Sequence, residues 1–224
     1  MKSEWNKLDN AAKIFPAAQS KKDTQVFRFS CELYKTVNKD LLQKATEDTL
    51  EEFDIFKSIL RRGLFWYYLE ESDIKPIVRE EYKIPCSLIY QRNNHKLLFE
   101  VTYYRNRINL EVFHVLTDGT GAMNFLKTLV SNYLTLAENV EDSGVDYDAS
   151  STQKSDDSFS KYYSGKISSK QENNPVAYKI VGQKYPDDKL KVINGMVDVK
   201  KVLEESHKYN ATLTAFLSAV LIQS

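Results

Sequence analysis

The sequence predicts an α/β protein built as a two-layer sandwich, in which helices pack on a mixed β-sheet. Residues 24–34 alternate apolar and polar side chains with the period of two that is typical of a strand. Residues 39–52 place apolar side chains at helical spacing instead. Residues 107–136 change from the first pattern to the second across a short loop. Strands combined with amphipathic helices indicate a sheet that is covered by helices.

The composition excludes a disordered chain. The 224 residues suffice for one ordinary domain or for one and a half small ones, and 42% of them are hydrophobic. Charge is balanced, with 31 Lys and Arg against 31 Asp and Glu. Such a chain has no general attraction to nucleic acid or to an anionic membrane, so we predict neither as a partner.

Glycine and cysteine usage argues against several kinds of site. Glycine occurs seven times, without the spacing of a phosphate-binding loop. Cys31 and Cys86 form no CxxC pair, so we predict two buried small side chains and no metal site. The low cysteine count, the absence of a signal peptide at the start and the lack of a long apolar run predict a cytoplasmic protein.

The first strand and helix have clear local signals. In residues 24–34, the strand face predicted to be buried carries Phe27, Phe29, Cys31 and Leu33. The opposite face carries Arg28, Ser30 and Glu32. Asn38 can cap the helix predicted over about 39–52.

The middle of the chain predicts a strand meander. Gly63 indicates a turn that is followed by a strongly aromatic strand, and a short strand is expected near residues 86–90. Two further strands, within residues 96–104 and 107–115, are separated by the turn residues Arg105 and Asn106. We expect this meander to be antiparallel.

The sequence divides into three parts. Residues 1–140 form the predicted first subdomain, and residues 176–224 form another structured part. Between them, residues 141–175 are predicted to be a flexible linker or loop, because residues 141–174 hold nine serines and no leucine.

The last part has both strand and helix signals. Residues 177–183 and 189–197 show strand-like patterning. Asp198 can cap a following helix, Asn210 can end it, and Thr212 or Thr214 can begin a second one. That second helix is apolar on nearly every side and needs burial all round. We therefore expect residues 198–222 to self-associate, or to stay mobile and prone to aggregation.

Of three histidines, only His114 lies in a pattern that indicates chemistry. His95 is expected in a turn and His207 on a charged helix, both solvated. His114 ends a predicted strand and starts the motif H-x-x-x-D-G, which Asp118 and Gly119 complete. Purely structural roles for these residues remain open. The histidine could be a buried strand residue with a satisfied hydrogen bond, Asp118 could only cap the helix, and the glycines could only serve the turn.

Residues 111–130, EVFHVLTDGTGAMNFLKTLV, resemble the active-site segment of the chloramphenicol acetyltransferase-like superfamily. That group includes CoA-dependent alcohol acetyltransferases, plant HxxxDG acyltransferases and the condensation domains of nonribosomal peptide synthetases. The sequence is most similar to bacterial alcohol acetyltransferase-like proteins, and the similarity covers nearly the whole chain apart from the linker. The other matching segments are residues 5–17, 26–50, 61–70 and 211–221.

The resemblance implies an enzyme that moves an acyl group, here an acetyl group, from acyl-CoA to a hydroxyl or amine. His114 would be the general base, a task that suits a histidine near neutral pH. Asp118 would support the site by pairing with an arginine, for which Arg28 is a candidate. Gly119 would let the loop turn closely beneath the site. Acyl-CoA would be a co-substrate, with no tightly bound cofactor.

Two departures from the family pattern matter. Condensation domains have two adjacent histidines, whereas Phe113 stands at the first position here. The family also folds as two similar halves, and this chain corresponds to the first half and a truncated start of the second. Two other functions therefore stay open: carrier-protein-dependent condensation, and a catalytically silent binding or assembly module.

Overall fold

The computed structural model describes residues 5–8, 12–91 and 95–138, and in the later part of the chain residues 176, 181–182, 185–186, 189–193 and 195–224. The chain divides into two units, residues 1–188 and residues 189–224. The predicted linker, residues 141–175, lies outside the described residues. The predicted boundaries at 140 and 176 therefore stay predictions.

The central feature of the first unit is a four-stranded sheet in the order β2-β7-β6-β5. Its first three strands pair antiparallel, while β5 pairs parallel with β6, so the sheet is mixed as predicted. The strands are β2 (Val26–Glu32), β5 (Arg79–Glu80), β6 (Phe99–Tyr104) and β7 (Arg107–Phe113).

A second, three-stranded antiparallel sheet has the order β1-β4-β3. An isolated bridge between Ile59 and Leu97 connects it to the chain just before β6. Its strands are β1 (Trp5–Lys7), β3 (Ser58–Arg62) and β4 (Tyr67–Glu71). The turn after Gly63 is longer than the sequence predicts, because the Gly63 N–H bonds the Trp66 carbonyl and the aromatic strand begins only at Tyr67.

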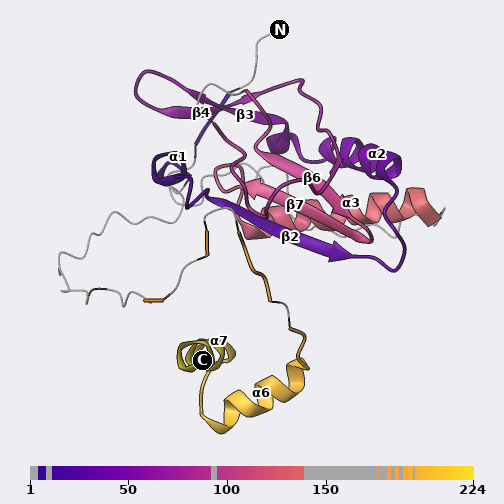
Figure 1. The fold of residues 1–224 in the computed structure, drawn as a ribbon. Helices are drawn as coiled ribbons and strands as arrows, with labels where there is room; N and C mark the ends of the chain where they lie inside the picture. Colours follow the sequence, from indigo (N-terminus) through magenta and orange to yellow (C-terminus); the bar gives the residue numbers. More distant parts are fainter. Residues whose placement is uncertain are drawn as a thin grey trace. The chain divides into compact units, whose positions relative to one another are not determined.

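Two helices, α2 (Lys39–Leu50) and α3 (Gly119–Glu138), pack together and cover one face of the four-stranded sheet (Figure 1). This arrangement confirms the predicted two-layer architecture. A short helix, α1 (Ile14–Ala18), precedes β2, and the 3₁₀ turn η1 (Asp54–Lys57) follows α2. The layer between helices and sheet is mostly apolar and includes Leu42, Ala45, Leu110, Val112, Phe125 and Leu129. The buried hydroxyls of Thr46 and Thr49 donate to carbonyls of their own helix, α2.

Local capping confirms where α2 begins. The Asn38 side chain accepts hydrogen bonds from the backbone N–H groups of Asp40 and Leu41. The Asn38 N–H in turn bonds the Tyr133 hydroxyl on α3, with 2.8 Å between N and O. This hydrogen bond connects the start of α2 to α3.

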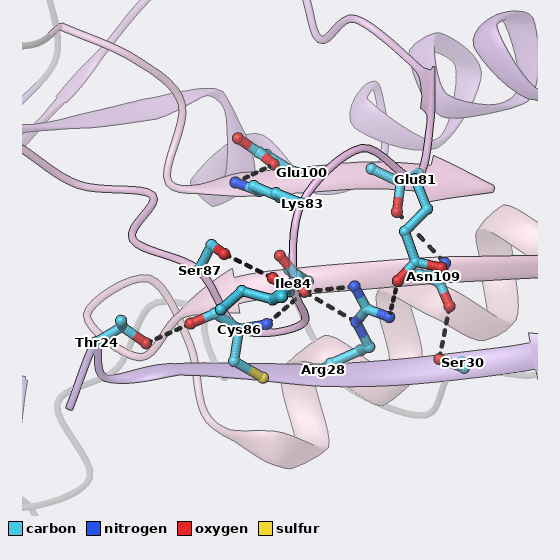
Figure 2. A network of polar contacts seen from close by, with 12 residues as sticks. Thr24, Arg28, Ser30, Glu81, Lys83, Ile84, Cys86, Ser87, Glu100 and Asn109 are labelled. Atoms are coloured by element: carbon cyan, nitrogen blue, oxygen red, sulfur yellow. Dashed lines mark hydrogen bonds and ion pairs between the residues drawn. The ribbon is translucent and has the colours of Figure 1, made fainter. Parts of the chain in front are cut away.

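The other face of the four-stranded sheet is crossed by residues 81–90, the segment that follows β5, which we call the strap (Figure 2). The strand predicted near residues 86–90 is wrong, because the structure has a strand only at residues 79–80 here. Cys86 has a φ of 58° and so breaks the extended conformation. The prediction that only one face of β2 is buried is also wrong for Arg28, whose side chain is 13% exposed beneath the strap.

The second unit contains α6 (Val199–Lys208) and α7 (Leu213–Gln223). Its capping predictions are confirmed: the Asp198 side chain accepts from the Lys201 N–H, and Thr212 begins α7. Asn210 adopts the left-handed φ of 50° between the helices.

The predicted strand over 189–197 is wrong for the described residues 189–193 and 195–197, which form no strand and find no neighbouring strand to pair with. The prediction for 177–183 falls mostly outside the described residues. Within the described residues, the structure has no helix both long and apolar enough to cross a membrane.

Candidate functional site

His114 lies immediately after β7, as the change of spacing predicts. Its backbone N–H bonds the Gln25 carbonyl, with 2.9 Å between N and O. The imidazole stacks on the Phe15 ring of α1 at 4.3 Å between centroids and is tilted against the Phe27 ring at 4.9 Å. The residue is half-buried, and no described side chain hydrogen-bonds its ring nitrogens. This geometry differs from that of a buried, hydrogen-bonded strand histidine.

The loop from His114 to Asp118 is held by its own apolar residues. Val115 and Leu116 are 3% and 5% exposed, and the Leu116 N–H closes a turn onto the Phe113 carbonyl. Phe113, at the position where condensation domains have a first histidine, is fully buried and stacks on Tyr90. The loop therefore presents His114 and buries its neighbours on either side.

Asp118 caps α3. Its Oδ1 accepts the Gly121 N–H at 2.9 Å, and its carbonyl accepts the Ala122 N–H. The capping role is therefore confirmed. Arg28 as the partner of Asp118 is wrong, because that guanidinium pairs with Glu81 and Glu111. Among the described residues, no ion pair joins any arginine to Asp118.

Steric contacts require glycine at position 121 more than at position 119. A Cβ added at Gly119 would meet only the Phe29 ring, at an ordinary 3.8 Å. A Cβ at Gly121 would come within 2.0 Å of Thr117 Oγ1 and 3.3 Å of Thr117 Cβ. The short, branched Thr117 side chain cannot move aside without shifting the loop.

We predict that Gly121→Ala destabilises the folded state and that Gly119→Ala does not. Alanine favours a helix by about 1 kcal/mol over glycine, so Gly119→Ala should be neutral or slightly stabilising. Gly121→Ala should lose that gain to the contact with Thr117 and lower the melting temperature. Thermal unfolding of both variants measures the difference. Equal melting temperatures would show that the loop adapts without cost.

A buried charged network lies under the strap, on the sheet face opposite the helices (Figure 2). Arg28 bonds Glu111 Oε1 through Nε at 2.9 Å and through Nη2 at 2.7 Å. Its Nη1 contacts Glu81, which also pairs with Arg107 Nη2 at 2.9 Å. The Glu111 side chain is only 1% exposed. Because a charge buried to this degree is costly unless it is paired, the network must stay intact in the folded state.

The network shifts the pKa values of Arg28 and Glu81 toward their charged forms. Burial by itself would lower the pKa of Arg28, but hydrogen bonds and charge from Glu81 and Glu111 outweigh it and raise that pKa. Burial by itself would raise the pKa of Glu81, but Arg28 and Arg107 outweigh it and lower that pKa. Burial raises the pKa of the Cys86 thiol, and the charge of Glu111 adds to this shift.

Sequence reasoning missed this network. The available signal was Glu111, an acidic residue inside the otherwise apolar run of β7 between Leu110 and Val112. It stands directly opposite Arg28 in the register of β2 and β7. A charge in such a run indicates a buried partner, but the sequence does not show which residue that partner is.

Among the described residues, no group of three or more His, Cys, Asp and Glu side chains is arranged to hold a metal ion. Both cysteines are half-buried and free. His114 lies in the loop between β7 and α3, and Asp118 and Gly119 lie at the start of α3.

Among the comparisons with known proteins, the one with solved structures bears on the fold. No family model matches the sequence, and no curated protein matches it. Among solved structures, a double mutant of the starter condensation domain of the rhizomide synthetase RzmA matches with a TM-score of 0.52 at 11% identity, covering 65% of this chain and 41% of that chain. The unmutated domain has a TM-score of 0.51 at 11% identity, with the same coverage. A mutant of that domain in complex with C8-CoA has a TM-score of 0.52 at 11% identity, covering 62% of this chain and 38% of that chain.

The fold of this chain is thus a mixed α/β fold similar to part of a condensation domain. The chain spans about two fifths of the length of the domains it matches. At this level of identity the likeness concerns the fold alone.

Proposed function

We propose that this chain carries the histidine-bearing part of an acyltransferase. It moves an acyl group, with acetyl as the first candidate, from acyl-CoA to a hydroxyl or amine acceptor. One observation carries the proposal: His114 follows β7 at the start of a loop that α3 continues, with no described side chain bonded to its ring nitrogens. The likeness to a domain whose mutant was solved with C8-CoA supports acyl-CoA as the donor.

In the proposed reaction, a ring nitrogen of His114 takes the proton of the acceptor hydroxyl or amine as its oxygen or nitrogen attacks the thioester carbonyl. The new bond to the acyl carbon forms, and the carbon–sulfur bond breaks. The CoA thiolate leaves and takes up the proton from the imidazolium. No covalent acyl-enzyme is needed, because the histidine acts only as base and then as acid.

The neighbours of His114 suit this role. Phe15 stacks on the imidazole and the Phe27 ring lies tilted against it, and the two contacts restrict the orientation of the His114 ring. Asp118 and Gly119 support the site by starting α3 directly after the loop. We also propose a cytoplasmic setting, which the two free cysteines favour.

A carrier-protein donor is the second candidate, because the structural neighbours are condensation domains. The test uses the purified chain with acetyl-CoA and octanoyl-CoA and a panel of small alcohols and amines, and follows release of CoA and formation of product. Saturation by acyl-CoA favours the first candidate. Transfer only from an acylated carrier protein favours the second. No transfer and no acyl-CoA binding would favour a catalytically silent module.

We further propose that α7 mediates self-association. Leu217 and Val220 are about half exposed, Leu221 is 76% exposed and Ile222 is 86% exposed. Full burial of each such side chain is worth roughly 1.5–3 kcal/mol, which favours a second copy as the partner. Sedimentation velocity over a range of concentrations should show an oligomer that Leu221→Lys disrupts. A strictly monomeric wild-type chain would refute this proposal.

A further inference from the structure

The strap is fastened to the sheet by buried charge. Glu111 Oε1 accepts the Cys86 N–H at 2.7 Å as well as its two bonds from Arg28. Nearer its beginning, the strap is held where Glu81 pairs with Arg28 and Arg107, and where Lys83 pairs with Glu100 at 2.6 Å. Because Glu111, Arg28 and Glu81 are largely buried, their pairing favours one position of the strap on the sheet.

The strap in turn fastens the segment that leads into β2. Thr24 Oγ1 donates to the Cys86 carbonyl at 2.7 Å, as Figure 2 shows. Gln19 Nε2 donates to the Tyr90 carbonyl at 3.2 Å. The N–H of Cys86 is therefore held from the sheet and its carbonyl from residues 19–25. Cys86 has a left-handed backbone, a conformation that a non-glycine residue keeps only where its surroundings impose it.

Residues 19–25, with the helix α1 just before them, also contact His114. The Gln25 carbonyl accepts the His114 N–H, and Phe15 of α1, which ends one residue before Gln19, stacks on the imidazole. A second contact runs from the strap to the residue before the histidine, since the Tyr90 and Phe113 rings stack at 5.5 Å. The contacts thus form a continuous chain from Glu111 through Cys86 and Thr24 to the backbone and ring of His114.

We propose that Glu111 and Thr24 are positioning residues for His114, acting through the strap and residues 19–25. Their effect on the rate of acyl transfer rests on the proposed function, whereas their effect on the position of the imidazole does not. A displacement of a catalytic group by about 1 Å can lower the reaction rate on the order of 100-fold. The contacts that hold His114 in place should therefore affect the rate.

The decisive variant is Thr24→Val, which keeps the shape of the side chain and removes its hydroxyl. Thr46→Val is the matched control, because Thr46 Oγ1 also donates to a backbone carbonyl at 2.7 Å, but within α2. Thr24→Ser restores the hydroxyl and should rescue the wild-type behaviour. Glu111→Gln tests the other end of the chain of contacts while keeping an acceptor oxygen.

The readout that is independent of activity is the NMR signal of the His114 Cε1–H group. The stacked Phe15 ring should shift this signal upfield, and the exposed His95 and His207 serve as internal references. We expect Thr24→Val and Glu111→Gln to move the signal toward those of the exposed histidines. Thr46→Val and Thr24→Ser should leave it in place. An unmoved signal in Thr24→Val, with the protein folded, would overturn the proposal even if Glu111→Gln fails to fold.

Kinetics then separates this inference from the proposed function. If the wild-type chain transfers acyl groups, Thr24→Val should lower kcat by about tenfold or more with little change in the KM for acyl-CoA, and Thr24→Ser should restore kcat. An unchanged kcat despite a shifted His114 signal would contradict the catalytic part of the inference. If the wild-type chain shows no transfer, the proposed function fails while the NMR test of the placement still stands.

Discussion

Replacing His114 with alanine is expected to lower the rate of acyl transfer by about 10²–10⁴-fold, the usual contribution of a general base. Acyl-CoA binding should change little, because the imidazole acts on the acceptor proton and not on the donor. The measurements are kcat from CoA release and the Kd for acyl-CoA from calorimetry. The change also removes a ring that stacks on Phe15, so a melting curve must show that the variant is folded.

His95→Ala is the matched control for this experiment, since it removes another imidazole, from an exposed site beside Arg61. It should leave kcat unchanged. Turnover of His114→Ala at the wild-type rate would remove His114 from the mechanism. A large loss of acyl-CoA binding with unchanged kcat would instead give the histidine a role in holding the donor.

Arg28→Ala is expected to lower the free energy of unfolding by about 3–5 kcal/mol, the usual cost of removing one partner from a buried ion pair. The substitution leaves Glu111, 1% exposed, without its cation, and leaves Glu81 with Arg107 alone. It also removes the ion pair between Arg28 on β2 and Glu81 of the strap. Urea denaturation followed by circular dichroism measures the loss.

The control for Arg28 is Lys35→Ala, which breaks an ion pair with Glu138 at a site where the lysine side chain is 76% exposed. Exposed pairs contribute at most about 1 kcal/mol, so this change should be small. Arg28→Lys keeps the charge but not the planar fork, and should fall between the two. Equal effects of Arg28→Ala and Lys35→Ala on the free energy of unfolding would show that the network under the strap contributes no more to stability than an exposed ion pair.

Sequence patterns were sufficient for the elements whose signals are local. Alternation predicted β2, β6 and β7, helical spacing predicted α2 and α3, and the caps at Asn38 and Asp198 lie where the side-chain types indicate. The placement of the candidate site followed in the same way, because the change of period across residues 113–119 required His114 to follow a strand and Asp118 to precede a helix.

Other predictions failed where the outcome depends on contacts between distant residues. Leu88, Ile89 and Tyr90 look like strand residues in the sequence, yet they belong to a strap that crosses the sheet. The family resemblance suggested Arg28 as the partner of Asp118, whereas the sheet register places Arg28 opposite Glu111.

The sequence by itself determined β2, α2, β6, β7 and α3 and the place of the H-x-x-x-D-G motif between β7 and α3. Periodicity and capping depend on residues within one or two turns of each other, which is why they can be read along the chain. Only the tertiary structure decided what holds the histidine: Arg28 and Glu111 are 83 positions apart, and Thr24 and Cys86 are 62 apart. Such pairs meet only once the sheet is formed and the strap lies on it, because a buried charge or hydroxyl takes whichever partner the packing brings within reach.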